Sequence, residues 1–139
     1  MKMILDTIDE KLIALLRENS KLSYKILGEK VHMTGQAVGL RVKRLEDEGV
    51  IKRYMIDTSA KEMGTLIAYV TLTMKTQEHQ KVKSFVMQHS EIIEASRISG
   101  EGCYLFKCEF KDHESLNAFC DGVLLFANYR VNIATDRIK

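Results

Sequence analysis

Apolar residues recur at helical spacing in the stretch that runs from Thr34 to Gly49. They are separated by steps of four and three residues, which predicts one helix with a narrow buried stripe. The stripe consists of Val38, Val42 and Leu45. Thr34 is expected to cap the first turn, and Gly49 suits the left-handed position that follows a helix. The β-branched residues after Gly49 predict a short strand that continues to Tyr54.

Two shorter amphipathic patterns precede this helix. Asp6 can cap a helix that ends near Glu18, and Ser23 can cap a second one over 24–31. Gly28 lies inside the second helix, and we expect a neighbouring helix to pack closely against it. Three helices with such short connections match a tri-helical helix-turn-helix, in which the following strand would be a wing or a connector.

The second half of the chain changes to alternating and β-branched patterns. The predicted elements are a strand at 66–75, a helix at 77–89, strands at 92–98 and 103–110, a helix after Asp112 to about Leu125, and a strand at 131–138. The order βαββαβ predicts a ferredoxin-like antiparallel sheet with both helices on one face. The other face, with Tyr69, Thr71 and Thr73 or their alternates, is a candidate surface for self-association.

These patterns predict an α+β chain of two domains. A helix-turn-helix domain occupies residues 1–54, a linker 55–65, and the βαββαβ domain 66–139. Thr58 or Ser59 is expected to start a single helical turn within the linker, which ends at Gly64.

The outer face of the Thr34–Gly49 helix carries an amide and basic side chains. Gln36 lies in the first turn, from which a glutamine can read adenine, and Lys43 is a candidate phosphate contact. Leu40 either touches thymine methyl groups or is a stray exposed leucine. Arg41 either contacts DNA or holds the helix in place through Glu46, Asp47 or backbone. An ordinary amphipathic helix with a solvated face is the alternative for the whole stretch.

Charge and composition narrow the function classes. The net charge of +2 argues against a histone-like, purely electrostatic binder, and the entire basic surplus lies in residues 1–64. No apolar run approaches the length of about 18 residues that a membrane span needs. The first ten residues contain acids and no long apolar run, so we expect no secretory signal and a cytoplasmic, nucleoid-associated protein.

The three cysteines favour no special chemistry. Cys103, Cys108 and Cys120 form no CxxC pair, so buried free thiols are expected rather than a disulfide framework or a zinc site. The chain contains no HExxH and no Walker loop. We therefore expect no enzyme activity, no metal site and no cofactor.

Two stretches resemble the Lrp/AsnC (leucine-responsive/asparagine regulator) family of transcription regulators. LDTIDEKLIALLRENSKLSYKILGEKVHMT is similar to the opening of that family, and VGLRVKRLEDEGVIKRY to its recognition helix and hinge strand. Residues that fall at family positions are Val38, Arg41, Val42, Leu45, Glu46, Gly49, Ile51 and Tyr54. DTSAKEMG resembles the family linker, and residues 66–138 resemble its effector and assembly module.

The resemblance implies a homodimer formed through the C-terminal sheets, assembling further to octamers, and double-stranded DNA as partner. It also implies an amino-acid effector at the turn between the second and third strands. The expected DNA-binding residues are Ser23, Thr34, Gly35, Gln36, Gly39, Leu40, Arg41, Lys43, Arg44, Lys52 and Arg53. The expected effector-binding residues are Ser99, Gly100, Glu101, Gly102, Cys103 and Tyr104.

The sequence departs from the family pattern in that turn. Many amino-acid-responsive relatives carry an aspartate at the position of Cys103, and a thiol is a poor replacement for an acid that pairs with an ammonium group. Gly35 stands where relatives often have proline. The sequence thus predicts a sequence-specific regulator, with an architectural DNA-wrapping protein that has no effector as the alternative.

Overall fold

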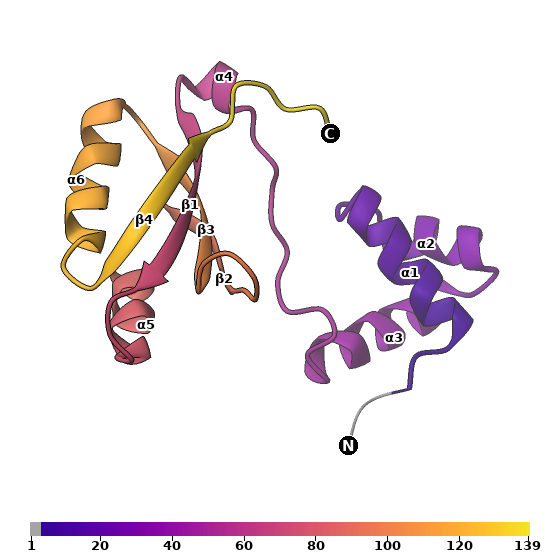
Figure 1. The fold of residues 1–139 in the computed structure, drawn as a ribbon. Coiled ribbons are helices and arrows are strands. Elements are labelled where there is room, and N and C mark those ends of the chain that lie inside the picture. The colour runs from indigo at the N-terminus through magenta and orange to yellow at the C-terminus, as the bar shows by residue number, and fades with distance from the viewer. Residues whose placement is uncertain (1–3) are drawn as a thin grey trace. The chain divides into compact units, whose positions relative to one another are not determined.

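Three helices pack around a small apolar core in the N-terminal part of the chain (Figure 1). The computed structural model describes residues 4–139, which divide into two units between Asp57 and Thr58. The helices are α1 (Thr7–Glu18), α2 (Tyr24–Val31) and α3 (Gly35–Asp47). Each begins after the residue that the sequence predicts as its cap, because Asp6, Ser23 and Thr34 all accept a hydrogen bond from a first-turn N–H.

The apolar stripe of α3 faces this core, as predicted. Val38, Val42 and Leu45 are at most 1% exposed. Val38 and Val42 pack with Leu12 of α1 and Leu27 of α2. Gly49 has a φ of +71°, so it ends α3 in the left-handed conformation that the sequence predicts. Burial of this stripe leaves the opposite face of α3 free.

The strand predicted after Gly49 is wrong. Residues 50–58 form no strand, and residues 4–57 contain none at all. The N–H groups of Val50 and Ile51 both turn back to the carbonyl of Leu45, and Ile51 packs on the core. A β-branched run needs a neighbouring strand to complete a ladder, and this unit provides none. Of the two predicted roles, wing or connector, the segment is the connector, and the N-terminal unit is not winged.

The C-terminal unit is a four-stranded antiparallel sheet with two helices on one face (Figure 1). Its elements are α4 (Ala60–Met63), β1 (Leu66–Met74), α5 (His79–Gln88), β2 (Ile92–Arg97), β3 (Tyr104–Phe110), α6 (His113–Val123) and β4 (Ala127–Ile133). The strand order β2-β3-β1-β4 is the ferredoxin-like arrangement predicted from the βαββαβ pattern. Ser59 caps α4, and Gly64 ends it with a φ of +69°.

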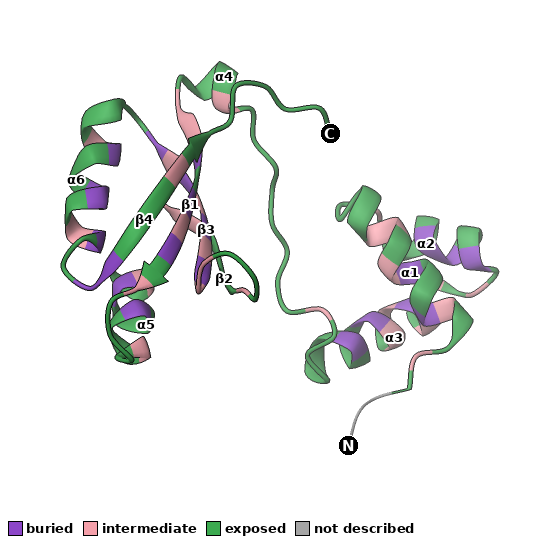
Figure 2. Ribbon diagram, in the orientation of Figure 1, coloured by how far each residue is buried: buried purple, intermediate pink, exposed green. Residues whose placement is uncertain are grey.

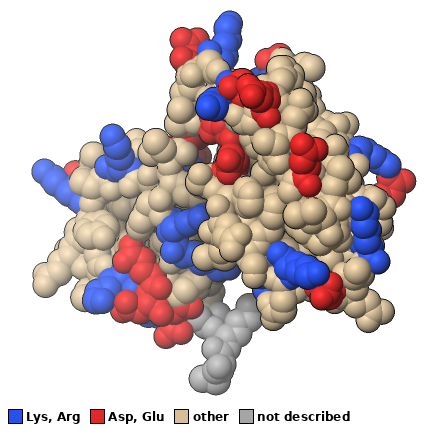
Figure 3. Space-filling view, turned by 90° about the vertical axis from the view of Figure 1, so that its left-hand side faces the viewer, with Lys and Arg blue, Asp and Glu red and all other residues tan. Residues whose placement is uncertain are grey.

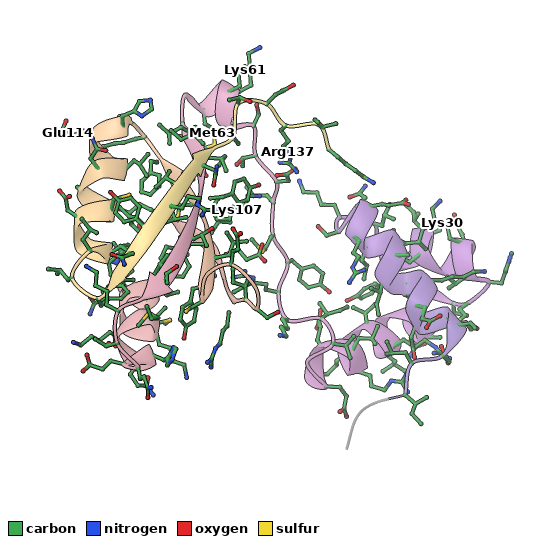
Figure 4. The ribbon with its side chains drawn as sticks, viewed as in Figure 1. Lys30, Lys61, Met63, Lys107, Glu114 and Arg137 are labelled. Carbon is green, nitrogen blue, oxygen red and sulfur yellow. The ribbon has the colours of Figure 1, made fainter. Side chains whose placement is uncertain are left out.

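Alternation along the strands sorts side chains between the two faces of the sheet. Val70 lies between Phe106 and Val131, and this row faces the helices, where the core is buried (Figure 2). Thr71, one residue on, faces the other way. We call this second side the open face. It carries Tyr69 and Lys107, which are cross-strand partners, and Figure 4 shows Lys107 on the side of the sheet away from α6.

The last strand starts earlier than the sequence pattern predicts. β4 covers Ala127–Ile133 rather than 131–138, because Phe126 and Ala127 are buried and bring the chain back to the sheet at once. Ala127 pairs with Met74 at the end of β1. α6 ends at Val123, two residues before the predicted end, and Leu124 is 43% exposed.

Candidate functional site

The outer face of α3 presents the side chains that the sequence predicts as DNA contacts. Gln36, Leu40 and Lys43 are exposed, and their spacing of four and three residues puts them on one face. Leu40 is 68% exposed. Thr34 caps the N-terminus of α3 and is also exposed. A helix with a buried apolar back and an exposed front fits the dimensions of a major groove.

Glycines allow α2 and the start of α3 to approach closely. A Cβ atom at Gly28 would lie 2.4 Å from the carbonyl oxygen of Met33, and one at Gly35 would lie 3.3 Å from the backbone nitrogen of Lys25. The predicted close neighbour of Gly28 is therefore present, although it is the turn before α3 rather than a helix. Gly39 faces the ring of Tyr24, with 3.1 Å from an ideal Cβ to that ring. These contacts fix the angle between the two helices of the motif.

Two arginines of α3 bind the carboxylates of Asp9 in α1 and of Asp6, the residue that caps α1. Arg41 Nη1 lies 2.7 Å from Asp6 Oδ2 and 2.9 Å from Asp9 Oδ1. Arg44 Nη2 lies 2.8 Å from the other oxygen of Asp9. The bonds to Asp6 and Asp9 raise the pKa of the Arg41 guanidinium. Of the two predicted roles of Arg41, this geometry corresponds to holding the helix in place, but its partners are not the predicted Glu46 and Asp47.

Asp9 is the one buried polar or charged residue among residues 4–139, with an exposed fraction of 0%. It also completes the capping box of α1, since the N–H of Asp6 donates to Asp9 Oδ2 at 3.2 Å. Its role as a buried partner of two arginines was not among the sequence predictions. The signal was present, because Asp9 lies three residues before Leu12 and seven before Leu16, on the apolar stripe of α1. An acid on a buried stripe requires a cationic partner.

The other basic residues of the predicted site are exposed. Lys43 pairs with Asp47 one turn further along α3, at 3.2 Å, and both side chains are largely exposed. Lys52 and Arg53 lie on the connector, and Ser23 lies at the cap of α2. Figure 3 looks from the left-hand side of Figure 1, where α6 lies, and on that face lysine and arginine are interspersed with aspartate and glutamate. This mixture agrees with the net charge of +2.

A tyrosine of the connector is anchored to α3. Tyr54 donates from its hydroxyl to Glu46 Oε1 at 2.6 Å. Burial, followed by this carboxylate, raises the pKa of Tyr54 to about 12. The two residues line a hollow of about 380 Å³ with Leu16, Ser23 and Tyr24, among others. The direction in which the connector leaves α3 is therefore set by a specific contact.

The predicted effector turn follows β2 and rests on β1. Gly100 and Gly102 have φ values of 102° and 96°, which favour glycine. A Cβ atom at Gly102 would lie 2.6 Å from the Thr71 side chain, so the turn and strand are in close contact. The N–H of Cys103 donates to the carbonyl of Leu72 at 2.6 Å. The backbone of the turn is thus held against the sheet.

A hollow of about 340 Å³ opens beside this turn. It is lined by Thr71, Thr73, Glu101, Gly102, Asn128, Tyr129 and Arg130. Glu101 and Arg130 form an exposed ion pair of 3.2 Å at its edge. Of the six predicted effector-binding residues, only Glu101 and Gly102 are in this lining, so the β1 and β4 side chains were missed. Their positions on one wall depend on the strand register, which the sequence pattern does not reveal.

Of the other predicted turn residues, Ser99 and Gly100 are exposed, whereas Cys103 and Tyr104 pack toward the core. Tyr104 is mostly buried, and its hydroxyl lies 2.7 Å from Nδ1 of His79 on α5. Cys103 is half-buried, whereas Cys108 and Cys120 are buried, and all three thiols are free as predicted. Burial raises the pKa of Cys108 to about 12. This keeps that thiol protonated and unreactive.

The described part of the chain holds no cluster of histidine, cysteine, aspartate or glutamate suited to a metal ion. Over residues 4–139, no helix combines the length and the apolar character that crossing a bilayer would require.

Comparisons with known proteins agree with both units. A family model described as an AsnC-type helix-turn-helix domain matches residues 5–46, and one described as the Lrp/AsnC ligand binding domain matches residues 67–139. The transcriptional regulator LrpB of Bacillus subtilis is 38% identical over 138 residues, which cover 99% of this chain and 93% of LrpB.

Solved structures show the same architecture. The structure of LrpC from Bacillus subtilis has a TM-score of 0.86 at 29% identity and covers 99% of each chain. The L-Met complex of regulator NMB0573 from Neisseria meningitidis has a TM-score of 0.84 at 24% identity, over 98% of this chain and 93% of that one, which shows the fold. Because both family models match in order and together span most of its length, the chain belongs to the Lrp/AsnC family of helix-turn-helix transcription regulators.

Proposed function

We propose that this regulator binds double-stranded DNA as a homo-oligomer, with the exposed face of α3 in the major groove. The observation that carries the proposal is the division of α3 into two faces. The residues of its apolar stripe are at most 1% exposed, while Gln36, Leu40 and Lys43 are exposed on the other side. A helix so divided can be held rigidly by its domain while its outer side chains reach base edges.

The outer side chains have complementary tasks in this proposal. Gln36 reads adenine through its amide, and Leu40 contacts thymine methyl groups. Lys43 exchanges its exposed ion pair with Asp47 for a phosphate. The free-energy cost of breaking that pair is small, because exposed ion pairs contribute about 0–1 kcal/mol. Lys52 and Arg53 bind phosphates from the connector. The contacts of α3 specify the sequence, and those of the connector add affinity.

The test replaces Gln36 and Lys43 by alanine together. We expect weaker binding to a site selected from random duplexes, and a salt dependence of log K that is shallower by about 0.9 for the lost phosphate contact. Fluorescence anisotropy at several salt concentrations measures both. A double variant with unchanged affinity and salt slope would contradict the proposal. Glu29→Ala, on the exposed side of α2, is a suitable surface control.

We further propose that a small molecule, such as an amino acid, modulates assembly at the Ser99–Tyr104 turn. The adjacent hollow of about 340 Å³ carries an acid, Glu101, and a base, Arg130, which complement the ammonium and carboxylate of an amino acid. A protein of the same fold, NMB0573, was crystallised with L-Met. By linkage, such a ligand must bind one assembly state more tightly than the other.

Light scattering of the protein alone, and with each of the twenty amino acids, tests this proposal. A mass that changes with one of them supports an effector, and Glu101→Gln should weaken that response. A mass that stays constant across the whole panel would contradict it. Met87→Gln, on the helix side of the sheet, is the matched control for a general surface effect.

Cys103 favours a second candidate, an architectural protein that wraps DNA with no effector. The thiol lacks the negative charge with which an aspartate would bind an ammonium group. Cys103→Asp separates the two candidates. If the original protein has no effector only because it lacks this aspartate, the assembly mass of Cys103→Asp should change when an amino acid is added, whereas that of the original protein should not.

A further inference from the structure

All three cations of α3 face carboxylates, but their partners differ in burial. Lys43 and Asp47 have side chains that are 70% and 64% exposed. Asp9, by contrast, is fully buried, and both its oxygens are used by Arg41 and Arg44. An exposed pair exchanges readily with solvent and with phosphates. A buried carboxylate cannot lose its cations without remaining uncompensated in the core.

The geometry also restricts where the two guanidinium groups can go. Asp9 cannot rotate away, because it closes the capping box of α1 while it binds the arginines. Arg41 has a second carboxylate, Asp6, at 2.7 Å. Each arginine is held through one terminal nitrogen, Nη1 of Arg41 and Nη2 of Arg44, so swinging the whole guanidinium group out to a phosphate breaks a contact with Asp6 or Asp9.

We propose that Asp9 is a specificity-determining residue that acts by holding Arg41 and Arg44 away from the DNA backbone. The inference rests on the proposed DNA interface of α3. Phosphate contacts supply affinity that does not depend on sequence. By occupying two of the three cations of the recognition helix, Asp9 lowers affinity for random DNA and leaves discrimination to the base-reading side chains. Asp9 itself is a positioning residue that touches no DNA.

The first variant removes the charge of this carboxylate and keeps its shape. For Asp9→Asn, we expect tighter binding to a mixed-sequence duplex at low salt. The slope of log K against log salt should become steeper by about 0.9 for each arginine released. A residue that merely supports the fold would weaken binding instead. Circular dichroism and a thermal melt verify that the N-terminal unit is folded.

A second variant, Arg44→Gln, leaves Asp9 unchanged and so tests the inference even if Asp9→Asn does not fold. Arg44→Gln leaves the Arg41–Asp9 and Arg41–Asp6 pairs intact. Lys43→Gln, one position earlier on the same helix, is the matched comparison. We expect Arg44→Gln to reduce the salt slope by less than half of the reduction that Lys43→Gln produces, because only Lys43 is available to phosphates.

The salt slopes of these variants separate a failure of the role proposed for Asp9 from a failure of the proposed DNA interface. The inference is overturned if Asp9→Asn is folded and has an unchanged slope, or if Arg44→Gln and Lys43→Gln reduce the slope equally. If Lys43→Gln leaves the slope unchanged, the proposed DNA interface of α3 fails, and the inference fails with it. The inference is supported if Asp9→Asn steepens the dependence of log K on log salt. The slope should then return to the original value in a triple variant that also carries Arg41→Gln and Arg44→Gln.

Discussion

Single residues in the N-terminal unit are constrained by quite different neighbours. Gly28 faces the backbone carbonyl of Met33, which cannot move without shifting the turn, whereas Gly39 faces the exposed ring of Tyr24, which can. Sequence alone indicates that both are glycines inside helices. Only the structure distinguishes an obligatory glycine from a tolerated one.

This difference gives a prediction at the residue scale. Gly28→Ala should lower the free energy of unfolding by about 1–2 kcal/mol, since overpacking costs more than the helix propensity of alanine returns. Gly39→Ala should change it by less than about 0.5 kcal/mol, because the ring of Tyr24 yields. Urea unfolding followed by circular dichroism measures both. Equal losses in the two variants would contradict the contacts described at Gly28.

A second residue-scale prediction concerns acid. The backbone N–H of Asp9, and then Arg41, lower the pKa of Asp6 from its ordinary value of 3.8. Because the folded-state pKa is lower than the unfolded one, the stabilisation by ionised Asp6 is complete above that ordinary value and is lost as the pH falls through the folded-state pKa.

Thermal melts of wild type and Asp6→Asn test this sign. The wild type should be the more stable near neutral pH, and the difference between their melting temperatures should shrink as the pH drops below about 4. A difference that is constant from pH 7 to pH 3 would show that the charge of Asp6 contributes nothing. Thr7→Ser, at an exposed neighbouring position, controls for effects of the turn.

At the scale of elements, the caps were predicted more accurately than the strand ends. Asp6, Ser23, Thr34, Ser59 and Asp112 all cap the helices that follow them. A cap acts within its own first turn, so a local pattern contains the information. The predicted strand after Gly49 and the boundaries of β4 were wrong, because a strand exists only where a partner strand pairs with it.

The cap of α3 provides the prediction at this scale. Thr34 Oγ1 accepts from the N–H of Ala37 at 3.2 Å. Thr34→Ala should lower the free energy of unfolding of the N-terminal unit by about 1 kcal/mol, and Thr34→Ser should recover most of it. Chemical unfolding measures the loss. If serine and alanine destabilise the unit equally, the hydroxyl is not the stabilising group.

At the scale of the whole molecule, the open face of the sheet is the surface that we propose for self-association. It carries Tyr69, which is 38% exposed, on a sheet whose other face is covered by α5 and α6 (Figure 2). Family membership makes assembly the expected use of this face.

We expect Tyr69→Asp to reduce the assembly to folded monomers, because it would bury a charge if the open face is the surface of self-association. Met87→Asp is the matched control, since Met87 is 85% exposed on α5 and lies on the helix side of the same unit. Light scattering gives the mass of each variant, and circular dichroism verifies folding. Monomers from Met87→Asp but not from Tyr69→Asp would assign self-association to the helix side instead.

The sequence by itself determined the helix caps, the buried stripe of α3, the βαββαβ order and the glycine-rich turn. Each of these is encoded within a few consecutive residues, through helical or strand periodicity. The tertiary structure decided that Asp9 binds Arg41 and Arg44, that β4 starts at Ala127, and that β1 and β4 line the hollow beside Glu101. These features join segments that are far apart along the chain, so they depend on register and packing rather than on any local pattern.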